Sequence, residues 1–207
     1  PMHVCRHHHH LAWVCVLAAA WGASACRRAP EPPATNPPPT AARVSVSDVA
    51  AAIDRSALYL AGLCDARGQF TYRTNLDADV EVDPAYNEVR HAGAVYALAQ
   101  SCQRSPQPAV EDAMRRSAQF LRQELLRPVA GNPRMWAAWL SPALADDDEP
   151  PLAKLGGTGL ALAALVSVEQ VVPGSPPLEE LRALGRFIIF MQKPDGTFYS
   201  KYFPDTG

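Results

Sequence analysis

The chain has 207 residues and a formal net charge of -2, with 19 Lys and Arg against 21 Asp and Glu. This balance gives no positive field that would attract nucleic acid, so we expect no nucleic-acid partner. Hydrophobic residues make up 48% of the chain and occur in blocks with helical periodicity, which is enough for one globular domain once the N-terminal segment is set aside.

The first 25 residues have the pattern of an export signal. Arg6 and the histidines at 7–10 form a polar, partly basic lead, and the apolar run at 11–20 is too short to span a bilayer. Small residues follow, Gly22-Ala-Ser-Ala25, and then Cys26. The segment resembles a bacterial lipoprotein signal peptide, which is cleaved before a cysteine that then receives lipid. Ala23 departs from that pattern, because the family usually has Leu there.

The resemblance implies a signal peptide at 1–25 and a lipidated Cys26 that anchors the protein to a membrane. Ordinary secretion, with cleavage after Ala23-Ser-Ala25, fits the same residues. In both cases we expect an exported protein, either periplasmic or anchored at the outer membrane. Residues 26–43 are rich in proline and form an extended spacer, so the folded domain is expected at 44–207.

The first helix of the domain is expected at 46–63. Ser45 and Asp48 fit a capping box at its start. Its inward face is predicted to carry four apolar residues, Val49, Ile53, Ala57 and Leu60. Gly68 supplies the turn after it, and a short extended piece follows at 69–74.

The second helix is expected to begin at Asp83 and Pro84 and to end near Gln103. Asp is a good N-cap, and Pro at the first helical position loses no hydrogen bond. From Ala92 onward the helix is small or apolar on nearly every face, so we expect it to be buried, with its polar N-terminal end at the mouth of a cavity.

Three more helices follow. An amphipathic helix starts around Pro106 and Pro108, with Val110, Met114, Leu121 and Leu125 inward. A long connection at 128–151 leads to an apolar helix at 155–171, which is rich in small residues. The last helix, at 178–191, is again amphipathic, and its buried face is predicted to carry Leu181, Gly185, Ile188 and Met191.

Several segments recur with a period of roughly 60 to 65 residues, which is typical of a helical-hairpin repeat. The recurring helical segments are Arg55-Ser-Ala-Leu-Tyr-Leu60, Arg116-Ser-Ala-Gln-Phe-Leu121 and Leu184-Gly-Arg-Phe-Ile-Ile189, and Arg67-Gly-Gln-Phe70 matches Asp195-Gly-Thr-Phe198. The pattern predicts an all-α fold with amphipathic helices in an outer layer and apolar helices in an inner layer, either a solenoid or a closed α/α toroid. The chain provides about two and a half hairpins, so we expect an incomplete ring. A helical array without repeats is the alternative.

The motif Gly185-Arg-Phe-Ile188, Gln192 and Gly196-Thr-Phe198 resembles the repeat of the terpenoid cyclase and protein prenyltransferase toroid superfamily. Phe198 stands where that family usually has Trp, and Cys64 occupies the Gln position of the first unit. The resemblance implies an α/α toroid fold and implies nothing about a catalytic mechanism. The acidic run at 146–149 is not the catalytic motif of squalene-type cyclases, and no zinc-binding set stands out. Exported sugar-active hydrolases, lyases and epimerases share the architecture, which is an analogy of fold alone.

The polar start of the second helix is the candidate site. The predicted catalytic residues are Asp83, Arg90 and His91, and the predicted substrate-binding residues there are Asp77, Asp79, Tyr86 and Asn87. On a helix, Asn87 and His91 share one face because they are four residues apart. His91 can transfer a proton, and Arg90 can clamp a carboxylate or phosphate. The alternative is structural: Asp83 caps, Arg90 pairs with a carboxylate, and His91 is a satisfied buried histidine.

Trp136 and Trp139, in the long connection, are predicted to form a sugar-stacking platform, or alternatively to plug the end of a hairpin. No cofactor and no metal ion is predicted, because the acidic run at 146–149 lacks the spaced ligands of a calcium loop. Cys64 and Cys102 are predicted to be half-buried free thiols, since each ends a helix of an antiparallel pair and such ends lie roughly 25 Å apart.

These observations predict an exported, lipid-anchored α/α-toroid enzyme that acts on a polysaccharide or another polymer of the cell envelope, of the hydrolase, lyase or epimerase type. The alternative is a non-catalytic lipoprotein that binds glycan or peptide or scaffolds an assembly. A terpenoid-cyclase-like enzyme is disfavoured by export and by the missing acidic motif.

Overall fold

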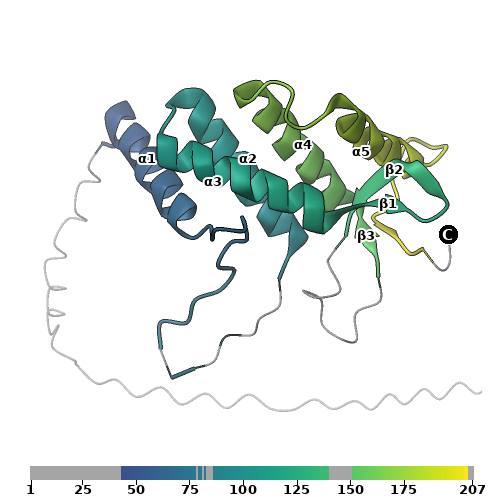
Figure 1. Cartoon of the computed structure of the whole chain (residues 1–207), viewed down its shortest axis with the longest axis horizontal. Helices are drawn as coiled ribbons and strands as arrows, with labels where there is room; N and C mark the ends of the chain where they lie inside the picture. Colours follow the sequence, from purple (N-terminus) through teal and green to yellow (C-terminus); the bar gives the residue numbers. More distant parts are fainter. Residues whose placement is uncertain (1–42, 78, 81, 83–85, 140–150, 205–207) are drawn as a thin grey trace, which may run out of the picture. The chain divides into compact units, whose positions relative to one another are not determined.

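Five α-helices make up most of the domain in the computed structural model, which describes residues 43–77, 79–80, 82, 86–139 and 151–204. They are α1 (Val46–Gly62), α2 (Glu88–Arg104), α3 (Pro108–Phe120), α4 (Leu155–Val171) and α5 (Leu178–Phe190), and a π-helical turn, η1 (Leu121–Leu125), continues α3 (Figure 1). The predicted signal peptide, Cys26 and the spacer up to residue 42 lie outside the described residues. No helix within the described ranges is long and apolar enough to cross a membrane.

The prediction of an all-α fold needs correction, because the described chain also forms two small antiparallel sheets. Strand β1 (Leu126–Val129) pairs with β2 (Asn132–Ala138), and β3 (Ala153–Lys154) pairs with β4 (Lys201–Tyr202). The first pair is a hairpin in part of the segment predicted to be an irregular connection. Gly131 has φ +76° in its turn, a conformation that favours glycine. The fold is therefore mostly helical with two sheets.

Helices α2 and α4 lie side by side and run in the same direction. At their N-terminal ends, a Cβ placed on Gly157 would lie 3.5 Å from the side chain of Glu88. At their C-terminal ends, the Gln103 amide donates to the Ser167 carbonyl at 3.0 Å and to the Gln170 side chain at 2.9 Å. Small residues at this contact allow the two backbones to approach closely. The N-terminal ends of α2 and α4 therefore meet at one end of the domain.

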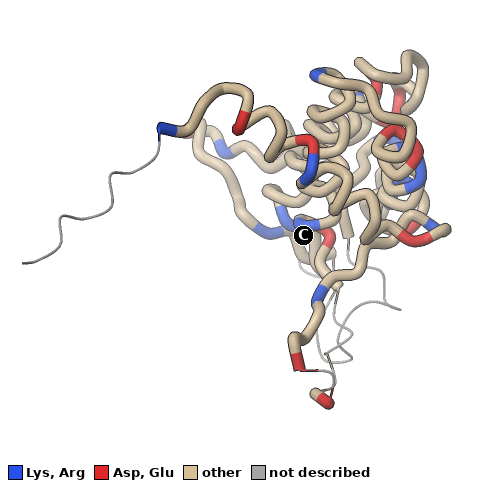
Figure 2. Tube along the Cα trace, turned by 90° about the vertical axis from the view of Figure 1, so that its left-hand side faces the viewer, with Lys and Arg blue, Asp and Glu red and all other residues tan. Residues whose placement is uncertain are grey.

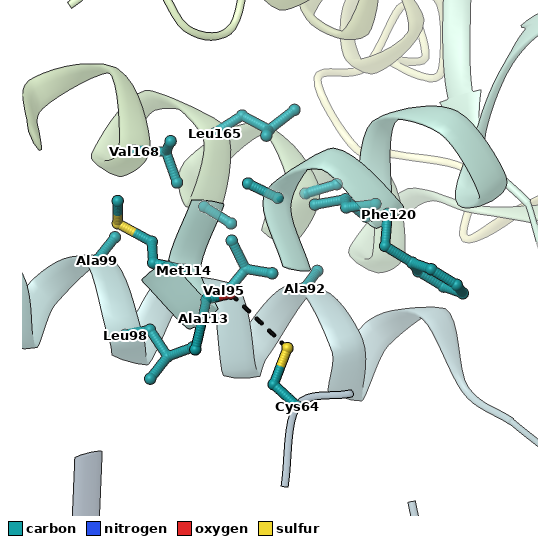
Figure 3. Packing of buried hydrophobic residues seen from close by; sticks show 14 of the residues in the cluster. Cys64, Ala92, Val95, Leu98, Ala99, Ala113, Met114, Phe120, Leu165 and Val168 are labelled. Atoms are coloured by element: carbon teal, nitrogen blue, oxygen red, sulfur yellow. Dashed lines mark hydrogen bonds between the residues drawn. The ribbon is translucent and has the colours of Figure 1, made fainter. Parts of the chain in front are cut away.

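The main core forms where α2 meets α3 and α4, and Figure 3 shows part of it. Val95 and Leu98 of α2 pack there with Met114 of α3 and with Leu165 and Val168 of α4. The inward face predicted for α3 is confirmed, since its four apolar residues are buried.

The predicted inward face of α5 is wrong in part: Met191 is buried as predicted, whereas Leu181, Gly185 and Ile188 are only half-buried. Ala183, Leu184 and Phe187 are the buried residues of this helix. Phe187 packs in a second cluster with Met135 and Trp139, which belong to β2 and the residue after it. The hairpin therefore covers α5, and its absence from the predicted fold explains the error.

The turns after α1 and α5 have the same hydrogen bonds, as the sequence match between them predicted. Asp65 N–H donates to the Gln69 carbonyl at 2.9 Å in the first turn, and Lys193 N–H donates to the Thr197 carbonyl at 2.7 Å in the second. Each turn also contains a glycine with positive φ, +92° at Gly68 and +85° at Gly196. Helices α1 and α5 therefore end in the same local structure.

Cys64 and Cys102 are free thiols, as predicted, and both are more deeply buried than expected. Burial raises the pKa of each thiol. The Cys64 sulfur lies 3.8 Å from the Ala113 carbonyl of α3, the contact drawn as a dashed line in Figure 3. Cys64 thus packs as a small apolar group between the first turn and α3.

Candidate functional site

Helix α2 begins at Glu88, later than predicted. Asn87 is its N-cap, with extended backbone (φ -140°, ψ 118°), and its side-chain oxygen accepts the Arg90 N–H at 3.0 Å. Tyr86 and Asn87 therefore precede the helix, and the predicted helical pairing of Asn87 with His91 is wrong. Asp83, predicted as cap and catalytic residue, lies outside the described residues. Asn is as good an N-cap as Asp, and Asn87 has this role in the structure.

His91 is buried, and both of its ring nitrogens have partners. Nδ1 lies 2.7 Å from the Tyr86 hydroxyl, and Nε2 lies 2.9 Å from the Ser117 carbonyl of α3. A carbonyl can only accept, so Nε2 carries the proton and Nδ1 accepts from the tyrosine. The Tyr86 oxygen in turn accepts the Phe70 N–H at 3.1 Å. One chain of hydrogen bonds thus links the first turn, the segment before α2, α2 itself and α3.

The surroundings of this pair are aromatic. The rings of Phe70 and Phe120 lie 5.2 and 5.1 Å from the His91 ring, centroid to centroid. Burial lowers the pKa of His91 to about 4, although the bond to the Ser117 carbonyl opposes the shift. Burial likewise raises the pKa of Tyr86 to about 12. Both groups are neutral at pH 7, and this geometry fits the structural alternative for His91. Its catalytic role stays a prediction.

Arg90 is an exposed residue of the predicted site, and it contacts Tyr72, a half-buried residue that was not predicted. The Arg90 guanidinium lies over the Tyr72 ring, 5.0 Å from its centroid, and the Arg73 guanidinium lies 5.1 Å from the same centroid. Tyr72 also packs against Tyr86, with ring centroids 5.7 Å apart. An aromatic ring and two guanidinium groups therefore gather just outside the Tyr86–His91 pair. In the view of Figure 2, by contrast, positive and negative residues are interspersed along the described chain.

A buried carboxylate at the same end of the domain was not predicted as a site residue. Glu88, the first residue of α2, is buried, and its Oε1 lies 3.8 Å from the Lys154 ammonium at the start of α4. A carboxylate is rarely this buried without a partner. Glu88 lies beside Gly157. The sequence signal for its burial is the pair of glycines that opens the apolar helix at 155–171, because residues without a side chain leave space for the side chain of a neighbouring helix.

Asp77 and Asp79, predicted to bind substrate, lie in an exposed loop. The Asp77 carboxylate accepts the Asp79 N–H at 3.1 Å, and Asp77 N–H donates to the Asn75 side chain at 3.0 Å. These bonds shape the loop locally and are not contacts with His91 or Arg90. The two aspartates therefore remain predicted ligand groups whose described contacts are structural.

Trp136 and Trp139 do not form a common platform, so that prediction is wrong. Trp136 packs against the main core, whereas Trp139 is buried in the second cluster. Each indole N–H donates to a carbonyl of the hairpin, from Trp136 to Pro133 at 3.0 Å and from Trp139 to Arg127 at 3.2 Å. The alternative, that they plug the hairpin end, agrees with these contacts.

A cavity of about 220 Å³ lies away from this end, between α3, η1 and the second half of α4. Arg122 lines it, and the Arg122 guanidinium is held by two hydrogen bonds of 2.6 Å to the Glu180 carboxylate. Among the described residues, no group of three or more His, Cys, Asp or Glu comes together to hold a metal ion. The basic and aromatic end near α2 is therefore the best-defined site.

No protein-family model, no curated protein and no solved structure matches this chain.

Proposed function

We propose that this chain is an exported lipoprotein, anchored through Cys26, whose domain binds an acidic polymer of the cell envelope. In this proposal the domain is part of an α/α toroid, with α2 and α4 as inner helices and α1, α3 and α5 as outer helices. The matching turns after α1 and α5 support the repeat, and the parallel packing of α2 and α4 supports the inner layer. The compartment is periplasmic or outer-membrane, and no nucleic acid is involved.

The observation that carries the binding proposal is the cluster of Tyr72, Arg73 and Arg90. An aromatic ring stacks on the apolar face of a sugar, and a guanidinium makes paired hydrogen bonds with a carboxylate or phosphate. The Arg90 and Arg73 guanidinium groups lie 5.0 and 5.1 Å from the Tyr72 ring centroid. This combination favours a glycan that carries negative charge over a neutral one.

Binding without turnover is favoured because His91 is buried and is not available to transfer a proton to a substrate. A general acid or base must reach the proton that it transfers, and both His91 nitrogens are already bonded in a buried aromatic site. Catalysis by a hydrolase, lyase or epimerase mechanism is the second candidate. The buried Glu88 carboxylate beside Lys154 favours it, although glycoside hydrolysis also needs a second carboxylate.

Binding of the full chain to a polyuronate and to neutral dextran tests the proposal. We expect saturable binding to the polyuronate, and Arg90→Ala should weaken it at least about tenfold, because a charge-assisted hydrogen bond is lost. The matched control is Arg182→Ala, which removes an exposed arginine of α5 whose partner is Glu179. Equal affinity of Arg90→Ala and the wild type, or equal binding of the two polymers, would contradict the proposal.

Two further measurements separate the alternatives. Release of polymer fragments over time, lost in a folded Glu88→Gln variant, would establish the enzymatic candidate in place of simple binding. For the anchor, metabolic labelling with a fatty acid should mark the wild type and leave Cys26→Ser unmarked. Labelling of Cys26→Ser, or no labelling of the wild type, would rule out this anchor.

A further inference from the structure

The cavity of about 220 Å³ between α3, η1 and α4 has both an apolar and a polar part, and it shares no residue with the basic and aromatic end near α2. Its apolar part includes Leu165 and Val168 of α4 and Val172, the residue that caps this helix. Sites for drug-sized ligands have volumes of roughly 300–1,000 Å³, so this cavity suits a smaller molecule.

The polar part of the lining comes from one stripe of α3 and η1. Residues three, four and seven positions apart lie on the same face of a helix. The residues at this spacing that line the cavity are Arg115, Ala118, Gln119, Arg122 and Gln123. No Asp or Glu is among the described residues of the lining, so the charged side chains on it are all positive.

Both guanidinium groups are held by carboxylates that do not line the cavity. Glu180 accepts from Nε and Nη2 of Arg122, each at 2.6 Å, and Glu111 accepts from Nε and Nη2 of Arg115 at 3.1 and 2.5 Å. These bonds fix the orientation of each guanidinium, which is what a binding site for a carboxylate needs. They also use the same side of each group and leave the N–H donors of Nη1 for a ligand.

The wall of the cavity also departs from a regular α-helix. Arg122 and Gln123 belong to η1, the π-helical turn that continues α3. Single π-helical turns are rare, and they occur frequently at functional sites. This backbone feature is independent of the charge of the lining and indicates the same place.

We propose that this cavity binds a small carboxylic acid with an apolar body, such as a short-chain fatty acid. The carboxylate accepts N–H groups of Arg115 and Arg122, because a guanidinium pairs well with a carboxylate. The apolar body covers Leu165, Val168 and Val172 and releases water from them. This site is additional to the cluster proposed to bind the polymer and does not depend on it.

Titration of the full chain with hexanoate at pH 7, followed by amide chemical shifts in two-dimensional NMR, tests the proposal. We expect saturable shifts for residues that line the cavity. Hexanamide has the same body without the charge, and acetate has the charge with almost no body. Each should bind at least about tenfold more weakly than hexanoate, because one loses a charge-assisted hydrogen bond and the other loses apolar burial.

Two variants separate the contributions of charge and shape. Arg115→Gln removes one guanidinium and should weaken hexanoate binding at least about tenfold. Val172→Trp keeps the charges and fills the cavity, so it should abolish binding of hexanoate and leave binding of the polyuronate unchanged. The Arg115 side chain is 50% exposed and Val172 is half-buried, so both variants should stay folded.

Arg182→Gln is the matched control, because Arg182 is an exposed arginine paired with a glutamate on its own helix and does not line the cavity. Its affinity for hexanoate should equal that of the wild type. The proposal is overturned if the shifts do not saturate, or if folded Val172→Trp binds hexanoate as the wild type does. It is equally overturned if hexanamide binds as tightly as hexanoate, or if Arg115→Gln behaves as the control does.

Discussion

The Tyr86 hydroxyl donates to Nδ1 of His91 across 2.7 Å, and this bond sets the role of both side chains. Tyr86 is fixed outside α2, where its oxygen also receives the Phe70 N–H. His91 is fixed as the tautomer that donates from Nε2 to α3. The pair therefore works as an internal connector between segments that are far apart in sequence.

Replacement of Tyr86 by Phe tests this connector. The substitution keeps the ring and leaves the Phe70 N–H and the His91 Nδ1 without a partner in a buried site. We expect the free energy of unfolding to fall by about 2–4 kcal/mol, since each unmet buried group costs about 1–3 kcal/mol. Urea denaturation followed by circular dichroism measures it. Tyr59→Phe, at an exposed site, should change stability by less than about 0.5 kcal/mol. Equal effects of the two substitutions would show that the hydrogen bonds contribute nothing.

The lowered pKa of His91 predicts how stability depends on pH. The pKa is about 4 in the folded protein against 6.5 for an ordinary histidine, so between these values the unfolded chain binds a proton that the folded one does not. Stability should therefore fall as the pH falls from 6.5 to 4, by about 3 kcal/mol from this group, and not change further below pH 4. Urea midpoints at pH 7, 5.5 and 4 for the wild type and His91→Phe isolate the contribution. If the urea midpoints of the two proteins fell equally with pH, His91 would not be the cause of the pH dependence.

The matching turns give a paired test of glycine. A Cβ added at Gly68 would meet the Arg116 carbonyl oxygen at 2.1 Å, whereas one added at Gly196 would meet nothing within 4 Å. Both residues have positive φ, so Ala at either position costs about 1–2 kcal/mol of backbone strain. Gly68→Ala should lose at least about 3 kcal/mol, because α3 must also move. Thermal unfolding of both variants measures the difference in stability. Similar losses of stability would show that α3 moves away from the added Cβ at little cost.

Arg122 and Glu180 should stabilise the contact between η1 and α5. Their two parallel hydrogen bonds of 2.6 Å are partly shielded from water. Arg122→Ala should lower the free energy of unfolding by about 1–2 kcal/mol. The exposed pair of Arg182 and Glu179 is the comparison, and Arg182→Ala should give no measurable change. If high salt removed the Arg122 effect entirely, the pair would be behaving as an exposed one.

Most helix positions were predictable from the sequence because segments containing glycine or proline separate the apolar blocks. The capping box of Ser45 and Asp48 is present as predicted. The hairpin at 126–138 was missed because each of its short strands contains a proline, Pro128 or Pro133, and proline disfavours strand pairing. The buried face of α5 was then mispredicted in part, since which of its residues are buried depends on that hairpin and not on α5 alone.

The residues of the candidate site lie close together, but their contacts were not predicted. Tyr86 and His91 contact each other at the start of α2, where Asn87 is the N-cap. Spacing alone could not show that Tyr86 lies outside the helix, since its position is set by the Phe70 N–H and the His91 ring. Glu88 was missed as a site residue because its burial comes from α4, a neighbour more than sixty residues away.

The parallel packing of α2 and α4 has an electrostatic consequence for their shared end. Each helix carries about half a positive charge at its N-terminus, and the two dipoles here add because they point the same way. The Glu88 carboxylate lies at the first turn of α2 and beside Gly157 in the first turn of α4. If α4 ran the other way, its negative end would face that carboxylate. The direction of an almost uncharged helix is thus favoured by one acidic residue on its neighbour.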